Sequence, residues 1–351
     1  MNISLTQEGK PFIFRLTILI FIFICLILSI ILINTDFKET ITDADESVNK
    51  EEFFSEPINN VYFGRDGWLY YIESIADYQR TNLFSEEELE KIKSNLQEVQ
   101  AFLAEKDIAF YLIIAPNKNT IYPEFMPTNV IRNESISRLE QIYNYIEENT
   151  DIKIIKVRDQ LISEKENSQL YYKTDTHWNQ EGARIASNEL LKAINADLPQ
   201  VPKLNLDIFN KTLRDSKMKD LAYMLERADE YKEEEYIYTP KINTIDVLRT
   251  NEPSDSFGVG VFNEMNDRGD TYQLSHYIKL RNASVKDGLR LYMIRDSFTV
   301  NMIPFINEAF YQCTYVWTSK FEKKAILEEE PDVVVYEVVE RYLQNLLWML
   351  D

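Results

Sequence analysis

The chain has 351 residues, 45% of them hydrophobic, which allows one large domain or two small ones with a substantial core. Its formal net charge of −20 makes nucleic acid and anionic membrane surfaces unfavourable partners for the body of the protein, because their phosphate groups would be repelled. Only eight glycines are present, and no glycine-rich loop of the kind that binds nucleotide phosphates occurs. We therefore expect no cofactor.

Residues 16–33 form an almost uninterrupted run of Leu, Ile and Phe, about as long as a membrane-spanning helix requires. Lys10 and Arg15 precede this run, whereas the residues after it are mostly acidic. The asymmetry predicts a cytoplasmic N-terminus (1–15), a single transmembrane anchor (16–34) and an extracytoplasmic remainder. The alternative is a cleaved signal peptide, which we disfavour because no small-x-small cleavage site follows.

The two cysteines and two histidines limit the chemistry of the chain. Cys25 lies in the predicted anchor and Cys313 in an apolar run, so we expect no disulfide between them in the outer domain. We interpret Cys313 as a buried structural thiol rather than a nucleophile. The histidine count excludes a three-histidine metal site, and no cysteine cluster offers a zinc site, so we predict no metal.

The first part of the outer chain begins with an acidic linker (35–56) and then becomes ordered. A turn at 65–67 joins two aromatic half-strands into a short hairpin over 61–71. Ser85 and Glu88 form a capping box before an amphipathic helix that reaches about residue 103. Residues 109–114 are continuously apolar and predict a buried strand.

Helices continue to alternate with buried strands after this point. The patterns predict a turn at 116–118, a helix over 136–146, a strand over 152–157 and a helix over 179–194. This alternation predicts an α/β sandwich with a mostly parallel sheet.

We assign the extracytoplasmic domain to residues 57–351. Within it, residues 204–242 differ from the rest in composition. They are dense in Lys, Asp and Glu, and we interpret them as a charged insertion of helix or loop on the surface, without a strong strand. Short strands resume at 244–248 and 271–280. His276, in the second of these, has no nearby carboxylate and is interpreted as structural rather than catalytic.

The C-terminal part contains the predicted strand 289–294, a helical stretch over 300–309, the strand 332–336 and a closing helix from Val338 through Leu347. Ser297 lies between the first strand and the first helix, where α/β sheets bind ligands. Its backbone N–H lies near a positive helix terminus, which suits an oxyanion. Ser256 occurs in the same Asp-Ser-Phe triplet, but it follows a loop sequence, and a solvated turn is the simpler interpretation.

The stretch 172–179, Tyr-Lys-Thr-Asp-Thr-His-Trp-Asn, holds a candidate base. Asp175 and His177 are two residues apart, so in an extended segment their side chains point to the same side. A carboxylate bonded to one ring nitrogen fixes the tautomer of a histidine base. Asp-x-His pairs are common on their own, but together with Ser297 this pair predicts a Ser-His-Asp triad.

Five motifs, in order along residues 57–345, point to a known family. They are Gly-x-Asp-Gly-Trp-Leu at 64–69, Pro-x-Lys with Ile-Tyr-Pro-Glu within 114–127, Asp-x-His-Trp-Asn-x-x-Gly at 175–182, Asp-Ser-Phe at 296–298 and the closing strand at 331–341. With these motifs the chain resembles the AlgJ/AlgX-like alginate O-acetyltransferase group of the SGNH-hydrolase superfamily and the related bacterial DHHW proteins.

The resemblance implies a three-layer α/β/α sandwich of the SGNH type, with Ser297 as nucleophile, His177 as base and Asp175 as orienting acid. It implies transfer of acetyl groups to a secreted or cell-surface polysaccharide, on the outside of a bacterial cell membrane. It also implies a partner, a membrane-bound O-acyltransferase that supplies the acetyl group. Arg295 departs from the glycine that many relatives place before the nucleophile turn, which could alter the oxyanion hole.

Five further residues are weaker candidates for contacts with the substrate or the oxyanion. Asn117, in the turn after the apolar strand, could be a second oxyanion donor. Lys118 and Arg295 could neutralise a donor or an acidic sugar, or form structural ion pairs. Tyr172 and Trp178 could stack on a sugar ring, although core packing is the favoured role for Trp178.

Two other functions remain open from the sequence. An esterase with the same triad would hand the acetyl group to water, and acceptor choice depends on how the site excludes water. A membrane-anchored glycan-binding or assembly protein would use the same fold without catalysis. The intact set of Asp175, His177 and Ser297 argues against this non-catalytic alternative.

Overall fold

A computed structural model describes residues 56–250 and 276–351. The predicted cytoplasmic segment, anchor and acidic linker (apart from Glu56), together with Ser256 and residues 271–275 of a predicted strand, lie outside the described residues. Among the residues that are described, no helix has the length and apolar character needed to cross a membrane.

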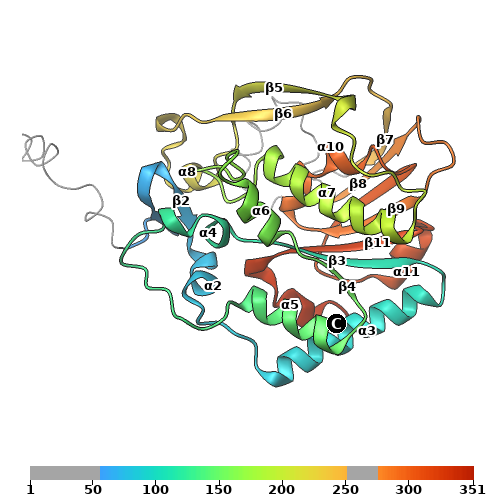
Figure 1. Cartoon of the computed structure of the whole chain (residues 1–351), viewed down its shortest axis with the longest axis horizontal. Helices are drawn as coiled ribbons and strands as arrows, with labels where there is room; N and C mark the ends of the chain where they lie inside the picture. Colours follow the sequence, from blue (N-terminus) through green and yellow to red (C-terminus); the bar gives the residue numbers. More distant parts are fainter. Residues whose placement is uncertain (1–55, 251–275) are drawn as a thin grey trace, which may run out of the picture. The chain divides into compact units, whose positions relative to one another are not determined.

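A seven-stranded sheet forms the centre of the domain, in the order β4-β3-β11-β9-β10-β8-β7 (Figure 1). The first five strands in this order run parallel to one another. β8 then pairs antiparallel with β10, and β7 pairs antiparallel with β8. The mostly parallel sheet expected from the sequence is therefore confirmed. Its strands are β3 (Ala109–Ala115), β4 (Lys153–Ile155), β7 (Ile245–Thr250), β8 (Tyr277–Asn282), β9 (Arg290–Arg295), β10 (Gln312–Trp317) and β11 (Val333–Val339).

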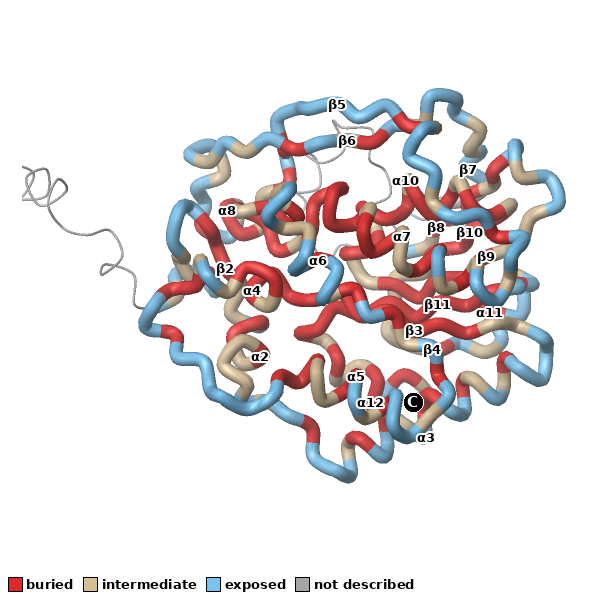
Figure 2. Tube along the Cα trace, viewed as in Figure 1, coloured by how far each residue is buried: buried red, intermediate tan, exposed pale blue. Residues whose placement is uncertain are grey.

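Helices cover both faces of this sheet (Figure 1). On one face α3 (Glu86–Ala104), α5 (Arg138–Asn149) and α12 (Asn345–Trp348) share a buried apolar cluster with the strands. On the other face α7 (Gln180–Asp197) and α10 (Ile303–Ile306) do the same. Sheets buried on both sides need continuous apolar strands, and β11 accordingly has all of its residues buried, as Figure 2 shows for the centre of the domain.

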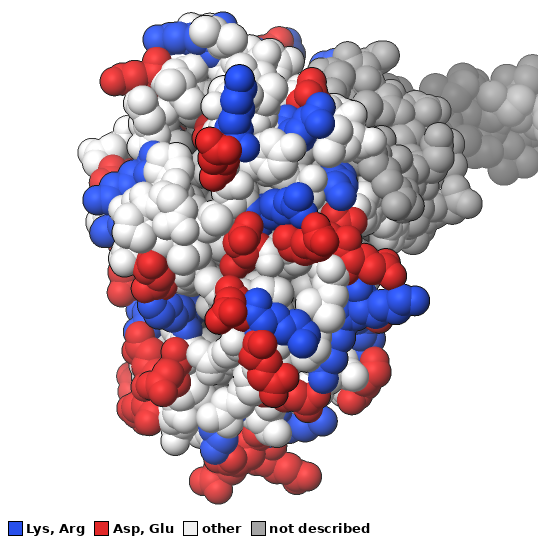
Figure 3. Space-filling view, turned by 90° about the vertical axis from the view of Figure 1, so that its right-hand side faces the viewer, with Lys and Arg blue, Asp and Glu red and all other residues white. Residues whose placement is uncertain are grey.

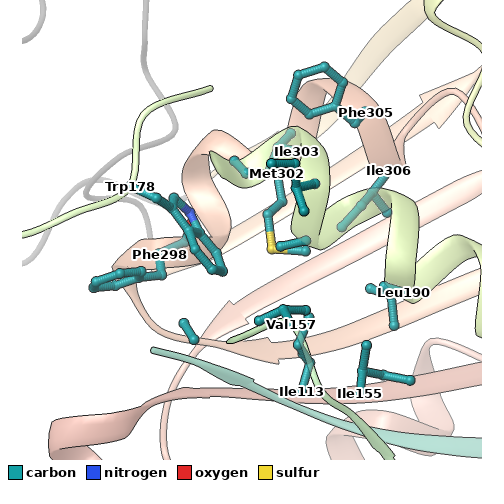
Figure 4. Close-up of a cluster of buried hydrophobic side chains, with 14 of the residues drawn as sticks. Ile113, Ile155, Val157, Trp178, Leu190, Phe298, Met302, Ile303, Phe305 and Ile306 are labelled. Atoms are coloured by element: carbon teal, nitrogen blue, oxygen red, sulfur yellow. The ribbon is translucent and has the colours of Figure 1, made fainter. Parts of the chain in front are cut away.

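Close packing joins the second face to α7 and α10. Figure 4 shows Ile113 of β3 and Ile155 of β4 lying toward Leu190 of α7 and Ile306 of α10. All four side chains are buried. Burying each such side chain stabilises the fold by roughly 1.5–3 kcal/mol.

Side-chain caps begin three of the longer helices, one of which the sequence predicts. Ser85 and Glu88 form the expected capping box at the start of α3. A second box, Ser137 with Glu140, begins α5, and the Asn179 side chain caps α7 by accepting from two backbone N–H groups. Each cap satisfies N–H groups that the first helical turn leaves unpaired.

The predicted hairpin is also present, since β1 (Val61–Phe63) pairs antiparallel with β2 (Leu69–Tyr71). The turn between these strands is η1 (Arg65–Gly67), in which Asp66 and Gly67 both have positive φ. The remaining short helices are η2 (Ile72–Ser74), α2 (Ile75–Gln79), α4 (Lys118–Ile121), η3 (Pro123–Phe125), α6 (Arg158–Glu164), η4 (Leu206–Ile208), α8 (Asp220–Met224), η5 (Ala228–Glu230), η6 (Ser297–Asn301), α11 (Lys323–Glu328) and η7 (Glu340–Tyr342).

Two predictions about secondary structure are wrong. The segment 204–242 contains strands, because β5 (Phe209–Asp215) pairs antiparallel with β6 (Glu234–Pro240). All residues of β5 except the first are exposed, so this strand does not need an apolar pattern. Its charged composition therefore gave no sign of a strand in the sequence. Val338 lies in β11 rather than in the closing helix, which begins at Asn345.

Charged side chains of both signs are interspersed on the face shown in Figure 3. Surface ion pairs among the described residues include Lys323 with Glu98 and Arg290 with Glu330. Such exposed pairs contribute little to stability, roughly 0–1 kcal/mol each.

Candidate active site

The candidate nucleophile, Ser297, follows the end of β9 and begins η6. Asp296 fixes this turn, since its carboxylate accepts a hydrogen bond from the backbone N–H of Phe298 (2.8 Å) and another from that of Val339 (2.7 Å). The turn is thereby tied to the end of β11, the neighbouring parallel strand. The Ser297 hydroxyl is thus held at the carboxyl edge of the sheet.

The candidate base lies in the loop that precedes α7. Tyr171 and Trp178 form an isolated bridge, and the N–H of Tyr172 donates to the carbonyl of His177 (3.2 Å). These bonds close the loop into a compact turn. The Asp175 carboxylate is therefore directed back at the histidine two residues later.

The structure brings Asp175, His177 and Ser297 together. His177 Nε2 lies 2.7 Å from Ser297 Oγ, and His177 Nδ1 lies 2.7 Å from Asp175 Oδ1. The same Asp175 oxygen also accepts from the His177 backbone N–H (3.0 Å). Both ring nitrogens are within the reach that proton transfer requires. The arrangement is that of a Ser-His-Asp triad.

The attraction between Asp175 and His177 determines the protonation states of both groups. Burial alone would raise the pKa of Asp175, but attraction to His177 and hydrogen bonding outweigh it and lower that pKa. Burial alone would likewise lower the pKa of His177, but attraction to Asp175 outweighs it and raises that pKa. The geometry therefore favours an ionised Asp175 and makes His177 a stronger base than an ordinary histidine.

Lys118 lies beneath the histidine loop. It is buried, and its ammonium donates to the carbonyls of Tyr172 (3.0 Å), Lys173 (3.0 Å) and Asp175 (2.7 Å). An ammonium has three N–H donors, so these carbonyls use all of them. Lys118 therefore braces the loop and neither contacts the pocket nor forms the ion pair that we had considered. Burial lowers its pKa to about 8.

Asn117 does not fulfil the oxyanion prediction. Its backbone N–H donates to Glu340 (2.8 Å), and its side-chain amide donates to Asp77 (2.9 Å). Both groups are thus committed to a buried network at the start of α4. The prediction failed because the turn after β3 directs Asn117 into the core rather than toward Ser297.

Tyr172 and Trp178 are both buried, so neither can stack on a sugar in this structure. The Tyr172 hydroxyl donates to Glu235, a carboxylate from β6. The Trp178 indole N–H donates to the carbonyl of Phe298 (2.8 Å), and the two rings pack edge to face. Core packing is therefore confirmed as the role of Trp178, which links the histidine loop to the nucleophile turn.

Of the five weaker candidates, Arg295 lines the pocket that contains Ser297. Its side chain is buried, lies 5.0 Å over the ring of Trp317 and donates to the carbonyl of Asp296 (3.1 Å). Burial lowers the pKa of Arg295 to about 10, so it is cationic at neutral pH. Contact with substrate remains a prediction for this residue.

The pocket has a volume of about 690 Å³ and is lined by residues from both sides of the triad. Sequence reasoning missed Arg341, whose buried guanidinium lies over the rings of Phe298 (5.2 Å), Tyr342 (5.0 Å) and Tyr71 (5.9 Å). Its Nε has no hydrogen-bond partner within 56–250 and 276–351. The match of 331–341 to a closing strand was the available signal, but it did not show where this side chain lies.

Asp220 was missed as well, because it lies in the segment interpreted as a surface insertion. Its carboxylate accepts from the Thr176 backbone N–H (2.7 Å) and hydroxyl (2.5 Å). Its own N–H donates to Asp175 Oδ2 (2.9 Å). The insertion therefore contributes directly to the surroundings of the triad.

Among the described residues, one group of side chains could in principle hold a cation. It consists of Asp175, His177 and Asp220, whose donor atoms all lie within 4.8 Å of one another. The His177 nitrogen that faces the carboxylates is already hydrogen-bonded to Asp175. That hydrogen bond uses the lone-pair position a metal would need, so the donor set fits a histidine oriented by a carboxylate better than a metal site.

His276 and Cys313 are placed as the sequence suggests. His276 is exposed just before β8, with its ring stacked on Trp317. Cys313 is buried in β10, and burial raises the pKa of its thiol to about 12. A thiol of this kind is a poor nucleophile.

Three comparisons place this chain among known proteins. Residues 61–257, more than half of the chain, match the family described as "SGNH hydrolase-like domain, acetyltransferase AlgX". That range includes Asp175 and His177 and ends before Ser297. A curated relative, "Probable alginate O-acetylase AlgJ" of Pseudomonas syringae pv. tomato, is 26% identical over 148 residues. The alignment covers 42% of this chain and only 37% of that relative.

Solved structures agree on the fold. Bacillus cereus PatB1 with a sulfonyl adduct is 17% identical, with a TM-score of 0.61 over 83% of this chain and 100% of its own. A DHHW family protein from Eubacterium siraeum is 14% identical, with a TM-score of 0.58 over 84% of this chain and 97% of its own. Together with the match over 61–257, they confirm the resemblance seen in the motifs. The chain belongs to the ALGX family, which carries the SGNH hydrolase-like domain of acetyltransferase AlgX.

Proposed function

We propose that this chain is a membrane-anchored O-acetyltransferase that moves acetyl groups onto a secreted or cell-surface polysaccharide. The observation that carries the proposal is the position of His177, whose two ring nitrogens lie 2.7 Å from Ser297 Oγ and 2.7 Å from Asp175 Oδ1. The names of the AlgX family and of the AlgJ relative support acetyl transfer as the reaction.

In the first half of the reaction the Ser297 oxygen attacks the carbonyl carbon of an acetyl donor, while His177 Nε2 takes the serine proton. The charge on the carbonyl oxygen is stabilised by the backbone N–H of Ser297. When the bond between the acetyl carbon and the donor breaks, His177 returns the proton to the leaving group. An acetyl-serine remains.

In the second half a sugar hydroxyl replaces the donor. His177 takes the hydroxyl proton as the sugar oxygen attacks the acetyl carbon, and the bond to Ser297 then breaks. The proton passes from His177 to the serine oxygen, which restores the free enzyme. Asp175 stays ionised throughout and stabilises the imidazolium in each half.

The surroundings follow from the same proposal. We assign the anchor to residues 16–34 and the domain to the outside of the bacterial membrane, since positive charges precede the apolar run and acidic residues follow it. A membrane-bound O-acyltransferase that exports acetyl groups is the partner that would supply the donor. Arg295 and Arg341 line the pocket and are the groups that would bind negative charge on a donor or acceptor.

The test compares the full-length chain with its Ser297→Ala variant. Each is incubated with p-nitrophenyl acetate, with and without oligosaccharide acceptors, and protein and glycan are examined by mass spectrometry. We expect acetyl on Ser297 and on the glycan in the wild type only. Ser163, exposed on α6, gives the matched Ser163→Ala control, which should behave as wild type.

Two outcomes would replace the proposal. Release of acetate to water alone, unaffected by every acceptor, would make the protein an esterase with the same triad. Equal behaviour of wild type and Ser297→Ala would rule out the triad and favour a glycan-binding or assembly protein.

A further inference from the structure

The structure points to Asp220 as a positioning residue that acts through His177, a second carboxylate brought to the base by the charged segment 204–242. This role deepens the proposed function and rests on it, because it assumes that His177 is the base. Asp175 would then share the stabilisation of the imidazolium with a residue from a different part of the chain.

Geometry places Asp220 beside the same face of the histidine as Asp175. Asp220 Oδ2 lies 3.7 Å from His177 Nδ1, within ion-pair distance of a protonated ring. The Thr176 hydroxyl lies beside both groups, 3.3 Å from His177 Nδ1, and donates to Asp220 Oδ2. A charge at this distance in a partly buried site acts strongly on a neighbouring cation.

The two carboxylates are also fixed relative to each other. The backbone N–H of Asp220, at the start of α8, donates to Asp175 Oδ2, the oxygen that faces away from His177. The N–H of Ala222 donates to the carbonyl of Thr174 (3.2 Å). α8 is therefore docked on the histidine loop by its backbone, which holds the Asp220 side chain in place.

Four charged groups face His177 from the elements packed around it. Asp175 from its own loop and Asp220 from α8 raise its pKa, whereas Arg341 from η7 lowers it. Lys118 from α4 lies under the loop and attracts both carboxylates. Burial and repulsion by Asp175 raise the pKa of Asp220 to about 6. Near neutral pH, Asp220 therefore contributes a second negative charge to the base.

The role in the reaction requires no new bond. Each time His177 takes a proton from Ser297 or from a sugar hydroxyl, its ring becomes a cation that faces two carboxylates instead of one. The proton stays on His177, and Asp220 only lowers the energy of the charged ring. Asp220 thus makes His177 a stronger base without touching the substrate.

A direct test measures the pKa of His177 by NMR in the full-length chain labelled with 15N-histidine. The sequence has two histidines, so His276 serves as the internal reference. Asp220→Asn keeps a carbonyl oxygen for Thr176 and removes the charge. We expect it to lower the pKa of His177 by about one unit. Asp229→Asn, which removes an exposed carboxylate from the same segment, should leave it unchanged.

Three results would overturn the inference. They are an unchanged His177 pKa in Asp220→Asn, an equal decrease in Asp229→Asn, and failure to fold by both Asp220→Asn and a second charge-removing variant, Asp220→Ser. The last result would make Asp220 a residue of the fold rather than of the base. Thr176→Val, which keeps both charges, should leave the His177 pKa unchanged and separates charge from hydrogen bonding.

Activity gives a second readout. In Asp220→Asn the acidic limb of kcat/KM should move to lower pH with the His177 pKa, and the plateau should fall by up to about 10-fold. The NMR result does not depend on acetyl transfer. A shifted pKa in a chain without transferase activity would therefore contradict the proposed function while leaving the effect of Asp220 intact.

Discussion

The two sides of the candidate triad are held in different ways. Ser297 is held by the sheet, because the Asp296 carboxylate accepts from the N–H of Phe298 within the turn and from that of Val339 at the end of the next parallel strand. His177 is held by charged side chains from distant segments. Lys118 binds three carbonyls of its loop, Asp220 binds Thr176, and Glu233 binds the backbone N–H of Lys173 (2.7 Å).

This difference teaches which side is easier to disturb. The serine side is held by Asp296 and by Glu337, a buried carboxylate of β11 that accepts from the Asp296 N–H (2.9 Å) and the Thr299 hydroxyl (2.9 Å). This support comes from two adjacent buried strands. The histidine side depends on buried polar contacts with segments far apart in the chain, and removing one partner of such a contact leaves the other without compensation. We therefore expect single substitutions to displace the base more readily than the nucleophile.

The strongest test of the comparison is Lys118→Met, which leaves three carbonyls without their donor. We expect the free energy of unfolding to decrease by about 3 kcal/mol, since hydrogen bonds to charged groups contribute roughly 1.5–3 kcal/mol each and the methionine recovers part of the packing. A displaced loop should reduce serine-dependent activity by about 100-fold. Urea titration and p-nitrophenyl acetate hydrolysis measure the two effects.

Lys173→Met is the matched control for that variant. Lys173 lies in the same loop, but its ammonium makes an exposed bond to the carbonyl of Asp66 (3.1 Å). Its replacement should change the free energy of unfolding by less than about 1 kcal/mol. Similar losses in both variants would mean that the loop is not braced from below.

On the serine side the corresponding change is Asp296→Asn. The amide keeps one acceptor but turns an N–H₂ donor toward a backbone N–H, either that of Phe298 or that of Val339. We expect activity to fall by about 30-fold while thermal unfolding shows a smaller loss than in Lys118→Met. The control is Asp332→Asn, because Asp332 accepts from the N–H of Arg290 in the same manner at the opposite end of β11 and should leave activity unchanged.

A smaller, substrate-dependent effect is expected for Arg341→Leu. Arg341 as a whole is 8% exposed, and its guanidinium lies over three aromatic rings, so it should attract an anionic group more strongly than a surface arginine would. Transfer to uronate-containing oligosaccharides should fall about 10-fold, whereas hydrolysis of uncharged p-nitrophenyl acetate should change less than 3-fold. Equal losses on both substrates would assign Arg341 a structural role.

The smallest effect on activity is expected for Glu340, which connects the two sides. Glu340 follows β11, and its carboxylate accepts from the Asn117 N–H and the Thr120 hydroxyl at the start of α4, which carries Lys118. Burial, followed by repulsion from Asp77, raises the pKa of Glu340 to about 7. The folded state therefore binds more protons than the unfolded chain between about pH 4.5 and 7, and its stability decreases as pH rises through this window.

Replacing Glu340 by Gln removes this titration. The free energy of unfolding of Glu340→Gln should depend less on pH between 4.5 and 7, by up to about 3 kcal/mol across the window, since each unit of pKa shift corresponds to about 1.4 kcal/mol. Urea titrations of both proteins at several pH values measure the difference. An equally steep dependence in the variant would assign it to other groups, such as Asp77, whose pKa burial also raises.

The sequence alone determined the elements that short-range patterns control. The Ser85–Glu88 capping box fixes where α3 begins, and continuous apolar runs identify β3 and the core of β11. The Asp-x-His spacing and the serine at a strand end also identified the three residues that the fold brings together. These features depend on a few neighbouring residues, so they are visible without the rest of the chain.

Tertiary structure decided how the polar residues are used. Asn117, Lys118, Tyr172 and Trp178 all come from motifs that resemble the family, yet each is turned into the core. Asp220 reaches His177 from a segment whose composition is that of an ordinary charged surface. A sequence does not show which of many similar carboxylates faces inward, because that depends on contacts between segments far apart in the chain.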